Sequence, residues 1–168
     1  PSWRNELEIT DALQILLSKN NKISYHVITD YWKDTGTPED IINANRAILE
    51  NKTNYFYGEK SDSVSLTGIV LIGKGTKILG NSQITGPVIV GENCILDNVC
   101  IGPNCSIGNN SQITNSNIQN SIVMSDCIIN TPIKIRNSII SSNSEIEFKN
   151  DSQDEKIFLL GEGTKILL

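Results

Sequence analysis

Histidine, methionine and aromatic side chains are scarce in this chain, which limits the chemistry that it can perform. Among its 168 residues are one histidine and one methionine, and aromatic residues make up only 5%. No apolar run approaches the roughly 20 residues that a membrane-spanning helix requires. A formal net charge of −5 argues against nonspecific binding to nucleic acid polymers or to an acidic membrane surface. We therefore expect neither a nucleic acid nor a membrane as a partner.

Metal-binding patterns of cysteine and histidine are also absent from the sequence. None of the four cysteines belongs to a C-x-x-C pair, and His26 lies far from all of them along the chain. A structural zinc site usually needs four closely spaced ligands of these two types. We therefore predict four free thiols in a cytoplasmic protein, without a zinc site or an intrachain disulfide. The four residues are Cys94, Cys100, Cys105 and Cys127.

Isoleucine, by contrast, is abundant, and its distribution divides the chain in two. Of 27 isoleucines, 18 lie within residues 69–146, together with 5 valines and only 8 charged residues. The first 60 residues contain 16 charged residues instead. We place the domain boundary after residue 52, which separates residues 1–52 from residues 53–168.

The first region begins with a predicted amphipathic helix. Thr10 or Asp11 can cap its start, and Asn20-Asn21 is expected to end it. The apolar stripe at helical spacing consists of Ile9, Leu13, Leu16 and Leu17.

A strand and a second helix follow in the same region. β-branched and aromatic residues predict a strand over Ile23–Thr29, with His26 in its middle. Thr37 is a cap for the second helix, and Pro38 is suited to its first position. The apolar side of that helix is expected to consist of Ile41, Ile48 and Leu49. About 50 residues cannot bury these faces by themselves, so we expect them to belong to a larger α/β domain.

The second region has an internal repeat of six residues, with a single step of five. The recurring aliphatic residues are Ile72, Ile78, Ile84, Val90, Leu96, Ile101, Ile107 and Ile113. Small side chains, including those of Cys94 and Cys105, mostly follow four residues later. This period fits neither a helix nor an alternating strand. It is typical of the hexapeptide β-helix, in which short strands wind a prism around one aliphatic column.

The repeat loosens after Ile113, where asparagine and serine replace glycine at the turns. The candidate interior positions there are Ile118, Val123, Ile129, Ile133, Ile139 and Ile146. Residues 147–156 read as a loop, and Leu160–Ile166 as a last strand or cap. We predict a β-helix from about Ser63 to Ile146, triangular in section and with three hexads per coil.

Some aliphatic residues lie beside the repeat column and are expected to be exposed. They are Ile69, Ile89 and Ile128. Because a solenoid has flat faces, we predict a homo-oligomer, a trimer or a dimer, that forms through faces of the β-helix.

Motifs in the first region resemble those of sugar-1-phosphate nucleotidyltransferases, particularly glucose-1-phosphate thymidylyltransferases. The first is Pro1–Asp11, in which the family usually has glycine at the position of Asn5. The second is Tyr31–Asp40, followed by Asn43–Arg46. A hexapeptide β-helix after such motifs is similar to the long form of the family.

The resemblance implies both a fold and a reaction. The fold is mainly β, a left-handed parallel β-helix of hexapeptide repeats preceded by a small α/β remnant of a nucleotidyltransferase domain. The reaction transfers a nucleoside monophosphate from a nucleoside triphosphate to a sugar 1-phosphate, with Mg²⁺ and with release of pyrophosphate. For a glucose-1-phosphate thymidylyltransferase, glucose 1-phosphate and dTTP give dTDP-glucose. The family's glycine-rich nucleotide loop is not found in the chain, which begins at Pro1, so we expect an inactive piece of a longer enzyme.

The resemblance also implies roles for individual residues. Asp34 matches the metal-binding aspartate, and a carboxylate suits Mg²⁺, although a turn aspartate would look the same. Arg4 matches the arginine that approaches the phosphates, unless it only pairs with a neighbouring glutamate. Glu8 and Trp32 are candidate substrate-binding residues. Alternatively, Glu8 only favours the N-terminus of a helix, and Trp32 is a packing residue.

Other functional classes remain open. Hexapeptide acyltransferases, some fused to nucleotidyltransferases, have the same β-helix, but they generally need a histidine on it as a general base. Residues 51–168 contain no histidine. In a third class the β-helix serves only oligomerisation or regulation.

Overall fold

Two compact units make up the computed structural model, which describes residues 7–29, 32 and 34–148. The first unit is Pro1–Asp34 and the second is Thr35–Leu168. Among the described residues the first unit contains one helix, and the second contains one helix and 17 strands. The boundary predicted after residue 52 separates an expected remnant of a nucleotidyltransferase domain from the β-helix domain. It is a different division from that into the two compact units, and it stays a prediction.

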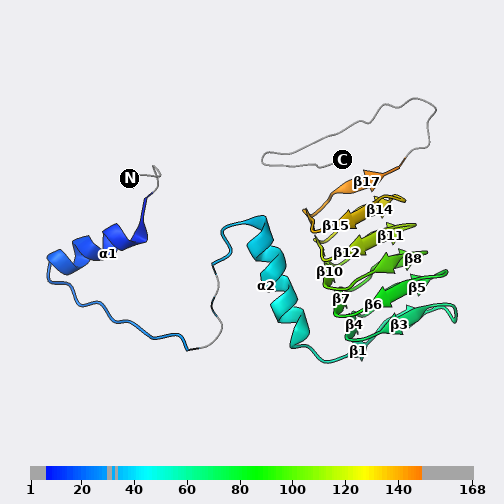
Figure 1. Ribbon diagram of the computed structural model, residues 1–168, viewed down its shortest axis with the longest axis horizontal. Helices are drawn as coiled ribbons and strands as arrows, with labels where there is room; N and C mark the ends of the chain where they lie inside the picture. The colour runs from blue at the N-terminus through cyan, green and yellow to red at the C-terminus, as the bar shows by residue number, and fades with distance from the viewer. Residues whose placement is uncertain (1–6, 30–31, 33, 149–168) are drawn as a thin grey trace. The chain divides into compact units, whose positions relative to one another are not determined.

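The strands of the second unit wind into a parallel β-helix, stacked from β1 at one end to β17 at the other (Figure 1). Each strand pairs in parallel with the third strand before and after it, which gives three sheets. Sheet A has the order β1-β4-β7-β10-β13-β16, sheet B β2-β5-β8-β11-β14-β17, and sheet C β3-β6-β9-β12-β15. The parallel, three-sided β-helix predicted from the six-residue repeat is confirmed, whereas its hand stays a prediction.

All of these strands are two or three residues long. Sheet A contains β1 Tyr55–Phe56, β4 Val70–Ile72, β7 Val88–Val90, β10 Cys105–Ile107, β13 Ile122–Val123 and β16 Ile139–Ile140. Sheet B contains β2 Glu59–Lys60, β5 Lys77–Leu79, β8 Ile95–Asp97, β11 Gln112–Thr114, β14 Ile128–Asn130 and β17 Glu145–Glu147. Sheet C contains β3 Ser65–Thr67, β6 Gln83–Thr85, β9 Cys100–Ile101, β12 Asn117–Gln119 and β15 Lys134–Arg136. The solenoid therefore begins at Tyr55, earlier than the predicted Ser63.

Strand pairing shows why the six-residue spacing is followed only at the start. Ile72 pairs with Val90, eighteen positions later, and Val90 pairs with Ile107 after seventeen. The next step in the same sheet, from Ile107 to Val123, takes sixteen. A coil thus contains three full hexads only at first, and later coils turn their corners with fewer residues.

The interior column is the core of this unit. The predicted positions from Ile72 to Ile113 have exposed fractions of 0–3%, and Ile118, Val123 and Ile129 are buried as well. Two later assignments were wrong, because Ile133 is 52% exposed and Ile139 is half-buried. Pairing with the preceding coils aligns other residues with the interior positions, namely Ile135 with Ile118 and Ile140 with Val123. Isoleucines lie on both faces of these strands, so the aliphatic pattern alone does not set the register.

Asparagine forms most corners of the solenoid, as the loosened repeat predicts. Eight asparagines from Asn93 to Asn143 have φ between 46° and 62°, in the left-handed region that asparagine tolerates better than most residues. Some of them stack from coil to coil through their side chains. Asn110 donates to Asp126 at 3.0 Å, and Asn120 donates to Asn137 at 2.6 Å.

Helix α2 (Pro38–Glu50) lies beside the stack of strands (Figure 1). Ile42 and Leu49 are its buried residues, whereas Ile41 and Ile48 are 40% and 60% exposed, so two of the three predicted apolar contacts were wrong. Leu71 of β4, whose neighbours in the strand both face the interior, is also buried. The side chains of Ile42, Leu49 and Leu71 do not belong to the core cluster of the prism, so they are buried outside it. Helix α2 contacts the solenoid at β10.

The first unit differs from its prediction in two ways. Helix α1 runs over Ile9–Ser18 and is preceded by Glu8, so Thr10 and Asp11 lie inside the helix and do not cap it. Residues 21–29 form no strand, and their side chains are exposed. A strand needs a neighbouring strand to accept its backbone hydrogen bonds, and no described residue pairs with Ile23–Thr29. His26 is therefore not in a strand, and α1 has no buried residue.

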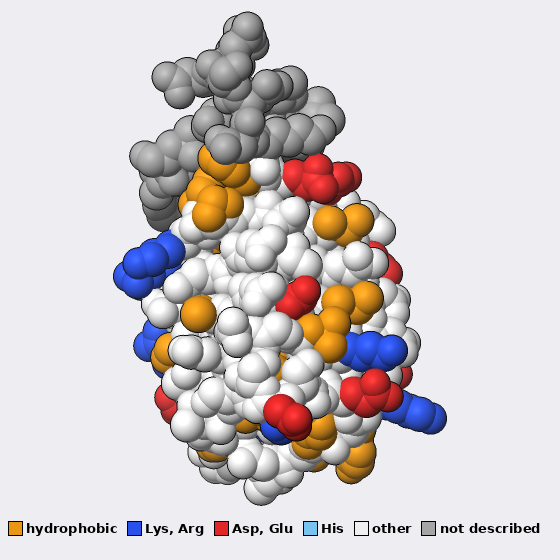
Figure 2. Space-filling model, turned by 90° about the vertical axis from the view of Figure 1, so that its right-hand side faces the viewer, with side chains coloured by type: hydrophobic (Ala, Val, Ile, Leu, Met, Phe, Trp, Pro, Cys, Tyr) orange, Lys and Arg blue, Asp and Glu red, His pale blue; other side chains and the backbone are white. Residues whose placement is uncertain are grey.

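The outer surface of the solenoid carries mixed polar and apolar side chains. On the face seen in Figure 2, lysine and arginine are interspersed with aspartate and glutamate, and hydrophobic side chains form small groups. Ile128 in sheet B is 43% exposed, as predicted, but Ile69 and Ile89 are only half-exposed. Residues 149–168, which include the predicted last strand, lie outside the described residues. Neither described helix has the length and apolar content that crossing a membrane requires.

Candidate functional site

The start of α2 is tightly defined by its own residues. The hydroxyl of Thr37 accepts a hydrogen bond from the backbone N–H of Asp40 at 3.2 Å, and the same hydroxyl donates to the Asp40 carboxylate at 2.6 Å. Pro38 occupies the first turn, where its missing N–H costs nothing, and Glu39 and Asp40 complement the helix dipole. The predicted cap and helix start are therefore confirmed. Asp34 precedes this cap by only three residues.

The four candidate residues from the family resemblance all belong to the first unit. Arg4 lies outside the described residues. The backbone carbonyl of Glu8 accepts from the N–H of Asp11 at 3.1 Å, at the start of α1. Trp32 is 70% exposed, and Asp34 is also exposed. Their roles stay predictions.

Asp34 is the candidate magnesium ligand that the family resemblance implies. Within residues 7–29, 32 and 34–148, no group of three or more histidine, cysteine, aspartate or glutamate side chains could hold a metal ion. Mg²⁺, however, is commonly bound by one or two carboxylates together with substrate phosphates. The exposed carboxylate of Asp34 fits that kind of shared site, in which phosphates and water supply the other oxygens.

Polar side chains in the middle of α2 join the helix to the β-helix. The Ser106 hydroxyl in β10 donates to Asn45 Oδ1 at 2.5 Å, and Asn45 Nδ2 donates to the backbone carbonyl of Asn104 at 3.5 Å. One residue later, Arg46 Nη2 donates to Asn120 Oδ1 at 3.0 Å. Asn104 and Asn120 are corner residues at which successive coils turn from sheet C to sheet A.

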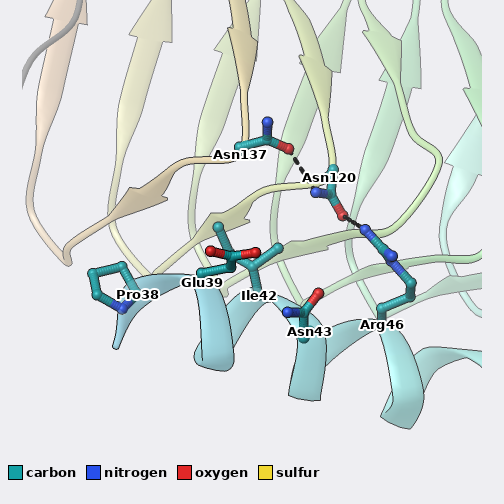
Figure 3. Close-up of a pocket in the computed structure, with 7 residues that line it drawn as sticks. All are labelled: Pro38, Glu39, Ile42, Asn43, Arg46, Asn120 and Asn137. Carbon is teal, nitrogen blue, oxygen red and sulfur yellow. Dashed lines mark hydrogen bonds between the residues drawn. The ribbon is translucent and has the colours of Figure 1, made fainter. Parts of the chain in front are cut away.

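A groove of about 530 Å³ runs along this contact (Figure 3). It is lined by Pro38, Glu39, Ile42, Asn43, Arg46, Asn120 and Asn137. Figure 3 shows the Arg46 side chain reaching from the helix to Asn120, which in turn contacts Asn137 on the next coil. Arg46 Nε is buried and has no hydrogen-bond partner in the described part of the chain.

Sequence reasoning did not identify this contact between helix and solenoid. Asn45 and Arg46 stand out in the sequence only as part of a family motif, and Ser106 occupies an outward position of the repeat. The partly buried Arg46 could not have been paired with a corner asparagine from sequence, because the pairing depends on which corner of the prism α2 follows. The only signal of this contact in the sequence is the polar pair Asn45-Arg46. The pair lies between Ile42 and Leu49 on a helix that is expected to pack within a larger domain.

Comparison with known proteins shows what the first region is similar to. Residues 1–51 match the family model described as nucleotidyl transferase. The chain is 52% identical over 68 residues to the low-salt glycan biosynthesis nucleotidyltransferase Agl11 of Haloferax volcanii, a match that covers 40% of this chain and 19% of that protein. It is 41% identical over 90 residues to a glucose-1-phosphate thymidylyltransferase of Streptomyces antibioticus, covering 54% of this chain and 25% of that protein.

A third relative carries a different name. The chain is 40% identical over 78 residues to the bifunctional protein GlmU of Methanococcus aeolicus, covering 46% of this chain and 19% of that protein. The matches thus span about a fifth to a quarter of the length of these relatives. Together the family match and these names support a relationship between the chain and sugar-1-phosphate nucleotidyltransferases.

Proposed function

We propose that this chain is the C-terminal part of a sugar-1-phosphate nucleotidyltransferase, with glucose 1-phosphate and dTTP as substrates and dTDP-glucose and pyrophosphate as products. The observation that carries the proposal is the nucleotidyl transferase match over residues 1–51, which includes Asp34 and the Thr37-capped start of α2. Two thymidylyltransferases among the relatives favour this nucleotide and sugar.

In the proposed reaction a phosphate oxygen of the sugar 1-phosphate attacks the α-phosphorus of the triphosphate. A new P–O bond forms, the bond between the α- and β-phosphates breaks, and pyrophosphate leaves with its electron pair. Asp34 would hold Mg²⁺, which when bound would neutralise charge on the phosphates. Arg4 orients phosphate oxygens with its planar guanidinium, and Glu8 and Trp32 contribute to substrate binding.

The β-helix is proposed to serve assembly or regulation. Ile95 and Ile128 are 38% and 43% exposed, and both pair with Gln112 on neighbouring strands of sheet B. This part of sheet B is a more suitable dimer or trimer contact than sheet A, where Ser106 already bonds to α2. Sedimentation of the full-length protein at micromolar concentration is expected to show an oligomer.

The direct test is an assay of the full-length protein with dTTP, glucose 1-phosphate and Mg²⁺. We expect release of pyrophosphate and formation of dTDP-glucose, and no pyrophosphate from the 168-residue chain alone. Parallel reactions with UTP and with glucosamine 1-phosphate measure specificity for the base and the sugar. The proposal would be overturned if no combination of nucleoside triphosphate and sugar 1-phosphate released pyrophosphate while acetyl-coenzyme A was consumed. That result would favour the acyltransferase alternative.

A further inference from the structure

The outer face of sheet B consists of two columns of side chains. In each of its three-residue strands the middle residue is the least exposed, and the first and third residues point outward. Strand pairing places the first residues of successive strands directly beside one another, and all of them are exposed. From β2 to β17 this first column consists of Glu59, Lys77, Ile95, Gln112, Ile128 and Glu145.

The first column has a centre of symmetry in its chemistry, at Gln112 of β11. Ile95 and Ile128 lie one strand away on either side of it. Lys77 and Glu145 lie two strands away, with opposite charges. If a second copy of the chain is turned by a twofold axis that runs along β11, its column faces this one in reverse order. Ile95 then meets Ile128 of the other copy, and Lys77 meets Glu145 of the other copy.

The second column of sheet B tolerates the same arrangement. Asp97 would face Asn130 of the other copy, which is an uncharged amide that can donate a hydrogen bond. Glu147 would lie at the level of Lys77 of the other copy and directly opposite Leu79. The contact with Leu79 is the only one in this arrangement that brings a charge against an aliphatic side chain.

A twofold axis along the solenoid would be less favourable. It keeps each strand opposite its own counterpart and reverses the strand direction, so the first column faces the second at the same level. Ile95 would then meet Asp97, and Glu145 would meet Glu147. Like charges directly opposite one another destabilise a contact, so the charges select the antiparallel arrangement.

The other two faces lack this self-complementarity. On sheet C the outward charges of the described strands are Lys134 and Arg136, both in β15, and no outward residue there is acidic or a large aliphatic. On sheet A the outward Ser106 already bonds to Asn45 of α2. Sheet B is therefore the face of the prism that fits a second copy of itself.

We propose that sheet B is the contact between two copies of this chain, packed antiparallel about a twofold axis along β11, with Lys77 of each copy paired with Glu145 of the other. The inference deepens the assembly role proposed for the β-helix and rests on it. Exposed isoleucines supply the apolar centre of the contact, and the flanking charges set its orientation. The contact is isologous, so each pair of residues occurs twice.

Charge reversal in the full-length protein tests the pairing. Lys77→Glu and Glu145→Lys each place two pairs of like charges in the contact, so each should raise the dissociation constant of the dimer at least about tenfold in sedimentation equilibrium. The variant that combines both changes should return to within a few-fold of the wild type. Lys77 and Glu145 are four strand spacings apart in one chain, about 19 Å, so this recovery can come only from pairing between copies. Lys134→Glu, the same change on sheet C, is the matched control and should leave the dimer unchanged.

Cross-linking tests the orientation of the two copies. Gln112→Cys and Glu59→Cys are prepared separately in a Cys100→Ser background, in which the other cysteines are buried. Gln112 should meet its own counterpart, whereas the two copies of Glu59 should lie six strand spacings apart, about 29 Å. A short bismaleimide should therefore link the Gln112→Cys protein into dimers and leave the Glu59→Cys protein unlinked. Equal linking at both positions would show a parallel arrangement and overturn the inference.

The remaining outcomes separate this inference from the proposals on which it depends. An oligomer that neither charge reversal weakens, or a cyclic trimer, would overturn the sheet B contact but keep an assembly role through another face. A monomeric wild-type protein would refute both the contact and the assembly role. Pyrophosphate release from the same samples reports on the proposed nucleotidyl-transfer reaction independently of the oligomeric state.

Discussion

At the scale of single residues, small polar side chains inside the corners satisfy the backbone of the neighbouring coil. The Thr76 hydroxyl donates to the carbonyl of Gly91 at 2.7 Å, and the backbone N–H of Cys94 donates back to that hydroxyl at 3.0 Å. The thiol of Cys94 in turn donates to the carbonyl of Gly108 at 3.1 Å. Because each buried backbone group needs a partner, these positions favour threonine, serine and cysteine over alanine. The sequence predicted small residues here, but not their hydrogen bonds.

The cysteines should differ sharply in reactivity. Cys94, Cys105 and Cys127 are fully buried, and Cys100 is exposed. Burial raises the pKa of the Cys94 and Cys105 thiols, against opposing hydrogen bonds, so little of the reactive thiolate forms there. We expect a disulfide-exchange reagent at neutral pH to modify one thiol rapidly in the folded chain and four in denaturant.

A Cys100→Ser variant provides the control, because it should lose the rapid phase and retain three slow thiols. Two or more rapid thiols in the native protein would contradict the interior placement. Fewer than four thiols in denaturant without reductant would show a disulfide that the structure does not contain.

Gly108 illustrates a second constraint on single residues, the close approach of successive coils. A Cβ atom at this position would lie 2.4 Å from the backbone nitrogen of Ser125 and 2.5 Å from the carbonyl carbon of Met124. Since backbone rather than a flexible side chain is in the way, Gly108→Ala should lower the free energy of unfolding by about 1–3 kcal/mol. Urea unfolding measures this loss.

Met124 supplies the comparison, because it occupies the equivalent position on the next coil and is 44% exposed. Met124→Ala should change stability by less than about 0.5 kcal/mol. Equal stability of the Gly108→Ala protein and the wild type would show that the coils can separate without cost.

At the scale of elements, the sequence correctly predicts those features that depend on residues of a single element. The start of α2 follows from Thr37, Pro38 and Asp40, which interact within a single turn. The strand expected at Ile23–Thr29 depends on a partner strand, which no described residue supplies. The interior residues Ile135 and Ile140 depend on pairing with the coil before them, so the six-residue count did not identify them.

Helix α2 offers a prediction at the same scale, since adjacent residues have opposite surroundings. Leu49 is 1% exposed and Ile48 is 60% exposed. Leu49→Ala should therefore lower the free energy of unfolding by about 2–5 kcal/mol, through lost burial and the cavity left behind. Ile48→Ala should have an effect below about 0.5 kcal/mol, because alanine has the higher helix propensity and little burial is lost. Comparable losses for the two variants, by urea unfolding, would contradict the placement of α2 on the solenoid.

At the scale of the whole molecule, the repeat and the motifs were readable from sequence for different reasons. The β-helix repeats one local pattern many times, so its three-sided architecture could be predicted from spacing alone. The candidate site rests on a motif around Asp34, and its family relationship is supported by the match over residues 1–51. The contact between α2 and the β-helix could not be predicted, because Arg46 and Asn120 are 74 residues apart and meet only in the folded chain.

The most direct test of the whole account is the turnover of the full-length Asp34→Asn protein, measured as pyrophosphate release with saturating dTTP, glucose 1-phosphate and Mg²⁺. A neutral amide cannot balance the charge of the metal, so turnover should fall on the order of 100-fold or more, while circular dichroism remains that of the wild type. Asp62→Asn, at an exposed position before β3, should leave turnover unchanged. Near-wild-type turnover of Asp34→Asn would contradict the account and leave Asp34 as a turn residue.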